Sequence, residues 1–169
     1  METMHALDDR NNLAGGEEQF LTFNLAGEEY GVPILKVQEI RSWDRVTPIP
    51  NSPPYIRGVL NLRGLIVPIM DLRLRFNLKE TEYTPVTAIV VINVAGRMAG
   101  LVVDSVSDVI SIGTDQRSAA PSYDGQKERE FIKGLAQTEG KLMILLDIDR
   151  LVGHEALDQA VTVGPGEQS

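Results

Sequence analysis

The 169-residue sequence contains no cysteine and only two histidines, which excludes several kinds of chemistry. Without cysteine there is no disulfide, zinc–thiolate site, iron–sulfur cluster or thiol nucleophile. His5 lies in a polar N-terminal segment and His154 in an expected C-terminal helix, so these residues do not predict a histidine-based triad or metal site. The phosphate-binding patterns G-x-x-x-x-G-K and G-x-G-x-x-G are also missing. We therefore expect no enzymatic activity, no cofactor and no metal.

Positive charge and long apolar runs are also scarce. The net charge is −8 and the pI is about 4.8, with no run of basic residues, which argues against a nucleic-acid partner. No apolar run approaches the roughly 20 residues of a membrane-spanning helix, and the N-terminus is too acidic and polar for a signal peptide. We expect a cytoplasmic protein that does not insert into the membrane. Its polar ends, 1–18 and 161–169, are predicted to be disordered tails around one domain at 19–160.

Acidic side chains come close to forming pairs at two places. Asp104 and Asp108 form one such pair, and Asp147 and Asp149 the other. In both pairs apolar residues lie between the carboxylates. Solvated strand faces or turn ends are therefore a better interpretation than a catalytic dyad.

Short runs of valine, isoleucine and leucine, punctuated by glycine, predict a mainly β protein with an internal repeat. Residues 20–40 align without a gap on 89–109, an offset of 69 positions (20 to 89). Residues 55–72 align on 131–148, an offset of 76 (55 to 131). We expect two similar small β units, covering about 20–72 and 89–148, that pack together and can exchange strands.

Each repeat contains two hairpin signals, in which a glycine follows Ala26, Arg63, Ala95 or Glu139 between apolar runs. In such a two-residue turn the side chain of Arg63 points to solvent. Four hairpins of short strands suit two small SH3-like barrels. Helix is expected in short segments at 33–38 and 127–135 and in a C-terminal helix at 149–161.

An apolar groove at the junction of the units is the binding site that the pattern favours. Val37 beside Glu39 suits a groove for an apolar partner helix with a polar rim. The alternative is that Val37, Val106 and Val109 are ordinary core residues. Trp43 and Tyr123 lie in expected loops or strand ends, where they would be either lids on the core or interface anchors.

Three segments closely resemble the CheW family, the coupling proteins of bacterial chemotaxis, and the resemblance extends from Phe20 to Val152. The segments are EEYGVPILKVQEI, VTPIPNSPPYIRGVLNLRGLIVPIMDLR and GLVVDSVSDVISI. The resemblance implies two five-stranded SH3-like barrels packed around a hydrophobic centre. It also implies a non-catalytic adaptor that joins the cytoplasmic tips of methyl-accepting chemoreceptors to the regulatory domain of the histidine kinase CheA, with ring contacts to other copies.

The family's contact residues carry over position by position. The receptor-binding residues would be Val37, Glu39, Arg63, Gly100, Val106 and Val109, with Arg63 paired to Glu39. The kinase-binding residues would be Gly58 and Gly134 at barrel ends and Tyr123 in a loop.

Other functions make different demands on the sequence. A CheV-type adaptor needs a receiver domain for which the chain has no room, and the kinase's own regulatory domain would have to be an excised fragment. The same adaptor role in a pathway that governs pili or a second messenger remains open. A small β-barrel enzyme or ligand-binding protein would need a polar pocket, and an RNA-binding barrel a basic face.

Overall fold

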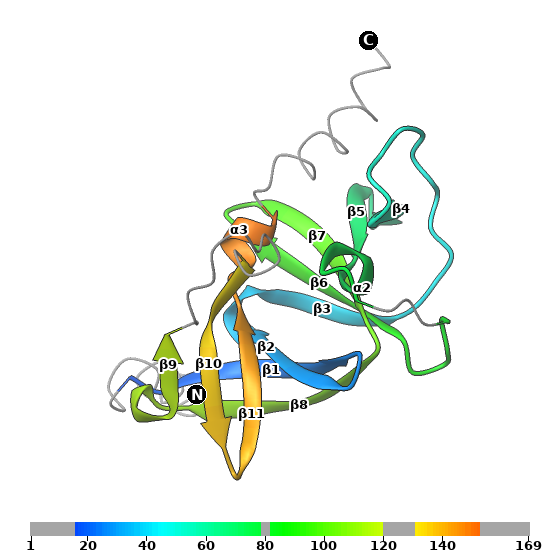
Figure 1. Ribbon diagram of the computed structural model, residues 1–169. Coiled ribbons are helices and arrows are strands. Elements are labelled where there is room, and N and C mark those ends of the chain that lie inside the picture. The colour runs from blue at the N-terminus through cyan, green and yellow to red at the C-terminus, as the bar shows by residue number, and fades with distance from the viewer. Residues whose placement is uncertain (1–15, 79–81, 120–130, 153–169) are drawn as a thin grey trace.

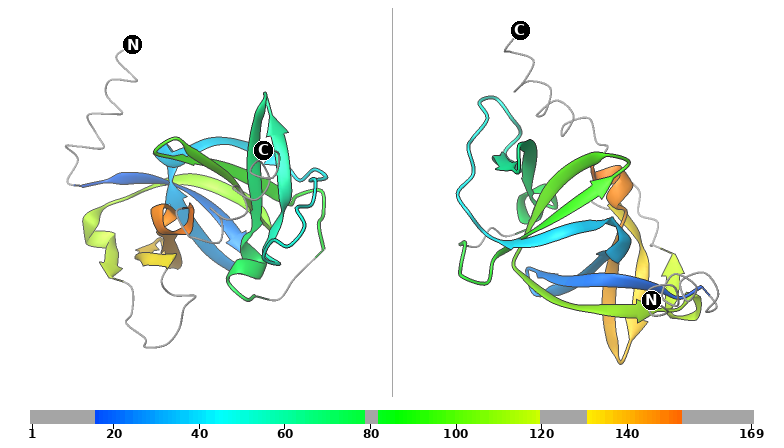
Figure 2. Two further views of the ribbon diagram at one scale, coloured as in Figure 1. Left: turned by 90° about the horizontal axis from the view of Figure 1, so that it is seen from above. Right: turned by 180° about the vertical axis from the view of Figure 1, so that it is seen from behind.

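Two curled β-sheets make up the molecule in a computed structural model that describes residues 16–78, 82–119 and 131–152 (Figure 1). The sheets are seen from above and from behind in Figure 2. Residues 1–15 of the expected N-terminal tail, the whole C-terminal tail, Tyr123 and the C-terminal helix beyond Val152 lie outside the described residues. Glu18, the last residue of the expected N-terminal tail, is already part of a strand.

The strands are short and most are joined by tight turns. The first repeat contains β1 (Glu18–Leu25), β2 (Glu28–Pro33), β3 (Val37–Ser42), β4 (Ile56–Leu62) and β5 (Leu65–Asp71). The second contains β6 (Ala88–Val94), β7 (Arg97–Val103), β8 (Ser105–Ile112), β9 (Arg117–Ala119), β10 (Ile132–Thr138) and β11 (Lys141–Leu146). The helices are η1 (Ile34–Lys36), α2 (Leu72–Arg75), η2 (Thr114–Gln116) and α3 (Ile148–Val152).

The two sheets have equivalent strand orders. The five-stranded sheet runs β3-β6-β7-β5-β4 and the six-stranded sheet β8-β1-β2-β11-β10-β9. With the repeat offsets applied, the two orders are the same apart from the three-residue strand β9. Each sheet therefore takes its β1–β2 or β6–β7 hairpin from one repeat and its remaining strands from the other. The mainly β, two-sheet architecture expected from the sequence is confirmed.

The register agrees with the same equivalence. In the parallel pair of β5 with β7, Ile69 lies opposite Gly100, and in the parallel pair of β11 with β2, Leu145 lies opposite Gly31. These positions differ by 76 and 69, the offsets of the sequence repeat. The two sheets therefore have the same pattern of strand pairing and register.

Positive φ angles at both central residues mark the four expected hairpin turns. The first of each pair has φ of 51° at Ala26, 52° at Arg63, 52° at Ala95 and 49° at Glu139, and each is followed by a glycine with positive φ. These are the angles of a type I′ turn, whose twist matches that of the flanking strands. The predicted hairpins are confirmed, and Arg63 lies at the tip of one of them.

Three apolar clusters hold the fold together. One cluster lies inside each sheet, and the largest joins residues of both sheets at their junction. A row of stacked aromatic rings, Phe23, Tyr30, Phe76 and Phe131, crosses this central cluster with centroids 6.1–6.3 Å apart. Because burial of apolar area is the main driving force for folding, the central cluster is what fixes one sheet on the other.

One local expectation needs correction. The helical segment expected at 127–135 does not extend past Phe131, because β10 begins at Ile132. Of the two positions expected for Asp104, a solvated strand face or a turn end, the structure shows the second: Asp104 lies between β7 and β8, where it pairs with Arg73. The segment at 33–38 does contain a helical turn, η1, as expected. No helix in the described ranges is long and apolar enough to cross a bilayer.

Candidate partner-binding site

Glu39 and Arg63 form the most prominent polar contact on the surface of the five-stranded sheet. Nη2 of Arg63 donates to Oε1 of Glu39 at 2.6 Å, and Nη1 of Arg41 donates to Oε2 at 3.3 Å. Glu39 and Arg41 are two positions apart on β3, so their side chains share one face. The side chain of Arg63 is 68% exposed and that of Glu39 24%. The outer, solvated group of the pair is therefore the guanidinium.

The curl of the sheet is what joins these residues. β3, which carries Glu39, is one edge of the five-stranded sheet, and the β4–β5 hairpin, which carries Arg63, forms the other edge. A flat sheet would hold these edges apart by the width of its three inner strands, at about 4.8 Å between neighbours. The ion pair therefore marks the place where the sheet closes on itself.

The two arginines change the protonation of Glu39. The hydrogen bonds from Arg63 and then from Arg41 lower the pKa of the Glu39 carboxyl, and they outweigh the opposing effect of desolvation. Glu39 is therefore ionised at neutral pH.

The six-stranded sheet has no equivalent pair. The repeat offsets place Asp108 at the position of Glu39 and Glu139 at the position of Arg63, so both sister residues are acidic. Asp108 instead accepts a hydrogen bond at 2.7 Å from the backbone N–H of Val109. The two sister tips lie on opposite sides of the molecule (Figures 1 and 2). One of the two sheets alone thus carries a closed, cationic tip.

The valines expected in the site have different surroundings. Val37 on β3 and Val106 on β8 are half-buried and pack against the central apolar cluster from the two sheets. Val109, further along β8, is 43% exposed. The first two therefore combine a core contact with a partly exposed side, and Val109 is a surface residue.

Gly100 is buried in β7. A Cβ atom there would lie 2.6 Å from Cδ1 of Ile69 and 2.8 Å from Cγ2 of Ile89. Any side chain at this position would press on the interior of the five-stranded sheet. Gly100 therefore faces the interior of the five-stranded sheet.

Gly58 and Gly134 occupy equivalent β-bulges, on β4 and β10. A Cβ on Gly58 would clash with the carbonyl of Thr47, and one on Gly134 would lie 2.8 Å from the carbonyl of Ser118. Both glycines are thus covered by the segment that runs along the outer edge of their sheet. Gly58 has φ of 145°, which L side chains rarely adopt.

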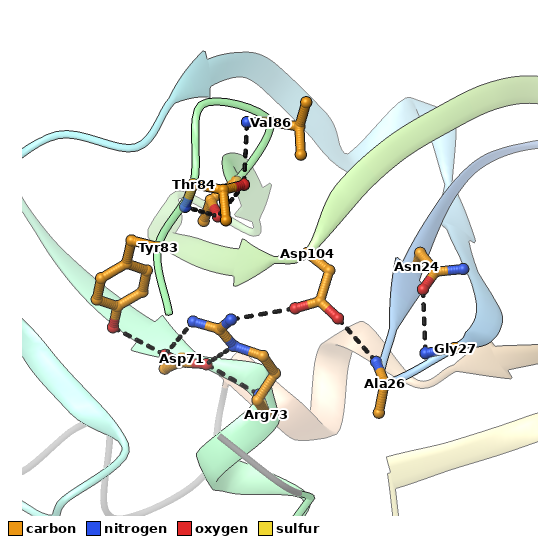
Figure 3. A network of polar contacts seen from close by, with 10 residues as sticks. Asn24, Ala26, Gly27, Asp71, Arg73, Tyr83, Thr84, Val86 and Asp104 are labelled. Atoms are coloured by element: carbon orange, nitrogen blue, oxygen red, sulfur yellow. Dashed lines mark hydrogen bonds and ion pairs between the residues drawn. The ribbon is translucent and has the colours of Figure 1, made fainter. Parts of the chain in front are cut away.

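A buried ionic network lies at the end of β5 that is away from the Arg63 turn, and the sequence did not predict it (Figure 3). Arg73 binds Asp71 through two charge-assisted bonds, Nε to Oδ1 and Nη2 to Oδ2, both 3.0 Å long. The side chains of Arg73 and Asp71 are 1% and 0% exposed. Nη1 of Arg73 reaches Asp104 at 3.1 Å, and the hydroxyl of Tyr83 donates to Asp71 at 2.9 Å. Asp71 lies next to the end of the repeat segment 55–72, and no pattern in the sequence pointed to its burial.

Trp43 and Tyr83 extend the network toward the surface. Their rings stack with centroids 4.0 Å apart, and the guanidinium of Arg73 lies 5.0 Å from the centroid of Tyr83. Burial, the charge of Asp71 and the hydrogen bond to it raise the pKa of Tyr83 to about 12. Trp43 also packs against the apolar cluster of the five-stranded sheet. Of the two roles considered for Trp43, the structure favours that of a lid on this cluster.

A pair of curled sheets with equivalent strand orders, one of them closed by an ion pair between its edges, defines a small two-sheet β protein. Comparison with known proteins gives the family. Residues 19–156 match the CheW-like domain. The chain belongs to the CheW family, the scaffolding proteins of chemotaxis signalling.

Individual relatives support this membership over most of the chain. The chemotaxis protein CheW of Klebsiella aerogenes is 45% identical over 156 residues, with 91% of this chain and 94% of the relative covered. The chemotaxis protein CheW of Rhizobium meliloti is 34% identical, with 88% and 96% covered. The crystal structure of the scaffolding protein TtCheW of Thermoanaerobacter tengcongensis superposes with a TM-score of 0.76 at 32% identity, with 82% of this chain and 94% of that chain covered. The two-barrel SH3-like fold expected from the sequence is confirmed, since this structural neighbour has two SH3-like barrel domains.

Proposed function

We propose that this protein is a non-catalytic coupling protein that joins the cytoplasmic tips of methyl-accepting chemoreceptors to the regulatory domain of the histidine kinase CheA. Family membership supports the scaffold role, and the relatives named above are chemotaxis and scaffolding proteins. In this proposal the protein works in the cytoplasm and is recruited to receptor arrays, where it also contacts other copies of itself.

The receptor is proposed to bind at the surface around Glu39 and Arg63. The observation that carries this is the asymmetry between the sister tips: an exposed guanidinium held by Glu39 at 2.6 Å on one, and acidic residues at both equivalent positions on the other. Fixing the guanidinium before binding reduces the entropy that a partner must overcome. Val37, Val106 and Val109 would supply the apolar part of the surface, with Gly100 supporting it from the interior of the sheet.

The kinase is proposed to bind at the edges covered by Thr47 and Ser118. Gly58 and Gly134 let these segments lie flat against β4 and β10, so they would act on the kinase contact by shaping the edge. Tyr123 is proposed to add a contact from its loop. Each contact can be weak on its own, since multiple contacts in an array add to the overall binding strength.

Titration of the purified protein with two fragments tests the proposal: a receptor cytoplasmic fragment and the kinase regulatory domain. The wild type should bind both. The variant Arg63→Glu should lose receptor binding and keep kinase binding, while Arg45→Glu, at an exposed arginine in the loop after β3, should keep both. If the wild type bound neither fragment, the proposal would be wrong.

A further inference from the structure

In the described part of the chain the backbone passes from one sheet to the other at two places. The first crossover is η1, between β2 and β3, and the second is Asp104, between β7 and β8. β3 begins with Val37, directly after the first crossover, and β8 carries Val106, two residues after the second. The positions of the crossovers therefore determine where both strands of the proposed receptor surface begin.

The second crossover is fixed from both sheets at once (Figure 3). On one side, Oδ1 of Asp104 accepts from Nη1 of Arg73, which follows β5 of the five-stranded sheet. On the other side, Oδ2 of Asp104 accepts from the backbone N–H of Ala26 at 2.8 Å, and the Asp104 N–H donates to the carbonyl of Asn24 at 3.0 Å. Asn24 and Ala26 belong to the β1–β2 hairpin of the six-stranded sheet. One carboxylate therefore connects the two sheets.

The first crossover has the equivalent contact with its charges reversed. Nζ of Lys36, the last residue of η1, donates to Oδ1 of Asp149 in α3 at 2.9 Å. The offset of 76 places Asp149 at the position of Arg73, and the offset of 69 places Lys36 one residue beyond the position of Asp104. The helix α2 follows β5 of the five-stranded sheet, and its ion pair joins it to the crossover at which the chain leaves that sheet. The helix α3 follows β11 of the six-stranded sheet and is joined in the same way to the crossover at which the chain leaves the six-stranded sheet.

The two contacts differ in burial. The Arg73 side chain is 1% exposed and that of Asp104 22%, whereas Lys36 is 35% exposed and Asp149 64%. An exposed pair is screened by water and salt, and it contributes less than a buried one. The β7–β8 crossover is therefore held more rigidly by its ion pair than the β2–β3 crossover is.

We propose that Arg73 and Lys36 are positioning residues that, through Asp104 and Asp149, set the angle between the two barrels and hence the spacing of β3 and β8. The consequence for receptor binding rests on the function proposed above. Neither residue has to touch the receptor in this account, because each acts through the crossover that it holds.

Distance measurements between spin labels test the proposal directly. The chain has no cysteine, so Val86→Cys before β6 and Leu142→Cys on β11 give two unique labelling sites, at residues 65% and 56% exposed. Asp104→Asn leaves the Asp71–Arg73 pair in place and removes the charge that joins the sheets. Its distance distribution should shift or broaden relative to the wild type, and that of Lys36→Met should broaden less. Asp44→Asn, at an exposed loop aspartate, is the matched control and should change nothing.

A charge swap separates positioning from loss of stability. Lys36→Asp should broaden the distribution, and the double variant Lys36→Asp/Asp149→Lys should restore it, although every side chain at the pair has changed. Since both residues are at the surface, these variants should fold even if Asp104→Asn does not. An unchanged distribution in Asp104→Asn and in Lys36→Asp would overturn the proposal, as would a failure of the swap to restore the wild-type distribution.

Receptor binding gives the second readout. In Asp104→Asn and Lys36→Asp the affinity for the receptor fragment should fall several-fold, with recovery in the charge swap. A wild type that bound no receptor fragment would overturn the proposed function and leave the distance measurements as the test of barrel positioning. Wild-type affinity in a variant with an altered distance distribution would overturn the link between barrel angle and receptor binding.

Discussion

The guanidinium of Arg63 donates to the carboxylate of Glu39 at 2.6 Å across the closure of the five-stranded sheet, although the two residues come from opposite edges of that sheet. The contact is at the surface, so it contributes more to the shape and charge of that surface than to the stability of the fold. Substitutions at this pair should therefore change binding more than they change the free energy of unfolding.

Arg63→Glu should preserve the fold and impair receptor binding. The substitution places a second carboxylate beside Glu39, but it leaves the type I′ turn and the apolar clusters untouched. We expect a melting temperature close to that of the wild type and an affinity for the receptor fragment lower by about tenfold or more, which corresponds to one lost strong contact. Thermal denaturation and titration calorimetry measure the two quantities. A loss of melting temperature as large as that caused by a core deletion would contradict this account.

Glu39 should titrate below its ordinary pKa of 4.5 because Arg63 and Arg41 donate to its ionised form. A lowered folded-state pKa means that the contribution of Glu39 to stability is present above the unfolded-state pKa. It is lost as the pH falls through the folded-state pKa. Carbon-detected NMR of the Glu39 carboxyl in the wild type should show the lowered pKa, and Arg63→Ala should return it toward 4.5. An unchanged pKa in Arg63→Ala would show that the contact is not formed in solution.

Tyr83 should remain protonated to unusually high pH. Its pKa of about 12, against an ordinary value of 10.0, means that the unfolded chain releases this proton before the folded protein does. The stabilising contribution of the protonated hydroxyl is therefore complete below pH 10 and is lost as the pH rises toward about 12. Burial also raises the pKa of Tyr30, so ultraviolet difference spectra should show more than one tyrosine titrating above its ordinary pKa. Tyr83→Phe should remove the transition near pH 12. A wild type whose tyrosines all titrate near pH 10 would contradict the buried hydrogen bond to Asp71.

Arg73→Met should be among the most destabilising single substitutions in the protein. It leaves the fully buried carboxylate of Asp71 without its cation, and breaking a buried pair in this way costs about 3–5 kcal/mol. The double variant Asp71→Leu/Arg73→Met should be more stable than Arg73→Met alone, because no unpaired charge remains. Urea denaturation gives both free energies of unfolding. Equal stability of the single and double variants would show that Asp71 is not a buried anion.

Gly100→Ala should reduce stability and receptor binding together. The new methyl group would meet Ile69 and Ile89, and overpacking of a core costs about 1–3 kcal/mol. Any effect on the receptor would follow from displacement of β7. Unfolding and binding curves on the same variant distinguish displacement of β7 from a direct receptor contact. Lost binding with full stability would place Gly100 in direct contact with the receptor.

The sequence predicted what depends on short-range chemistry. The four glycine turns involve neighbouring residues, and the two repeat offsets come from direct comparison of sequence segments. Together they were enough to predict a mainly β protein of two similar units. Together with the family's motif, they also singled out Arg63 at an exposed tip and paired it with Glu39. The repeat could not by itself show which strands pair, because strands of either copy have nearly the same apolar pattern.

Only the tertiary structure decided what depends on long-range packing. The exchange of the β1–β2 and β6–β7 hairpins and the curl that brings Glu39 to Arg63 are set by the packing of whole sheets around shared apolar clusters. Asp104 illustrates the limit: its apolar neighbours indicate a strand face or a turn end, but they do not show that it pairs with Arg73, which lies 31 positions away in the chain. Local sequence determined the hairpins, and the need to bury apolar area and to pair buried charges determined how they were assembled.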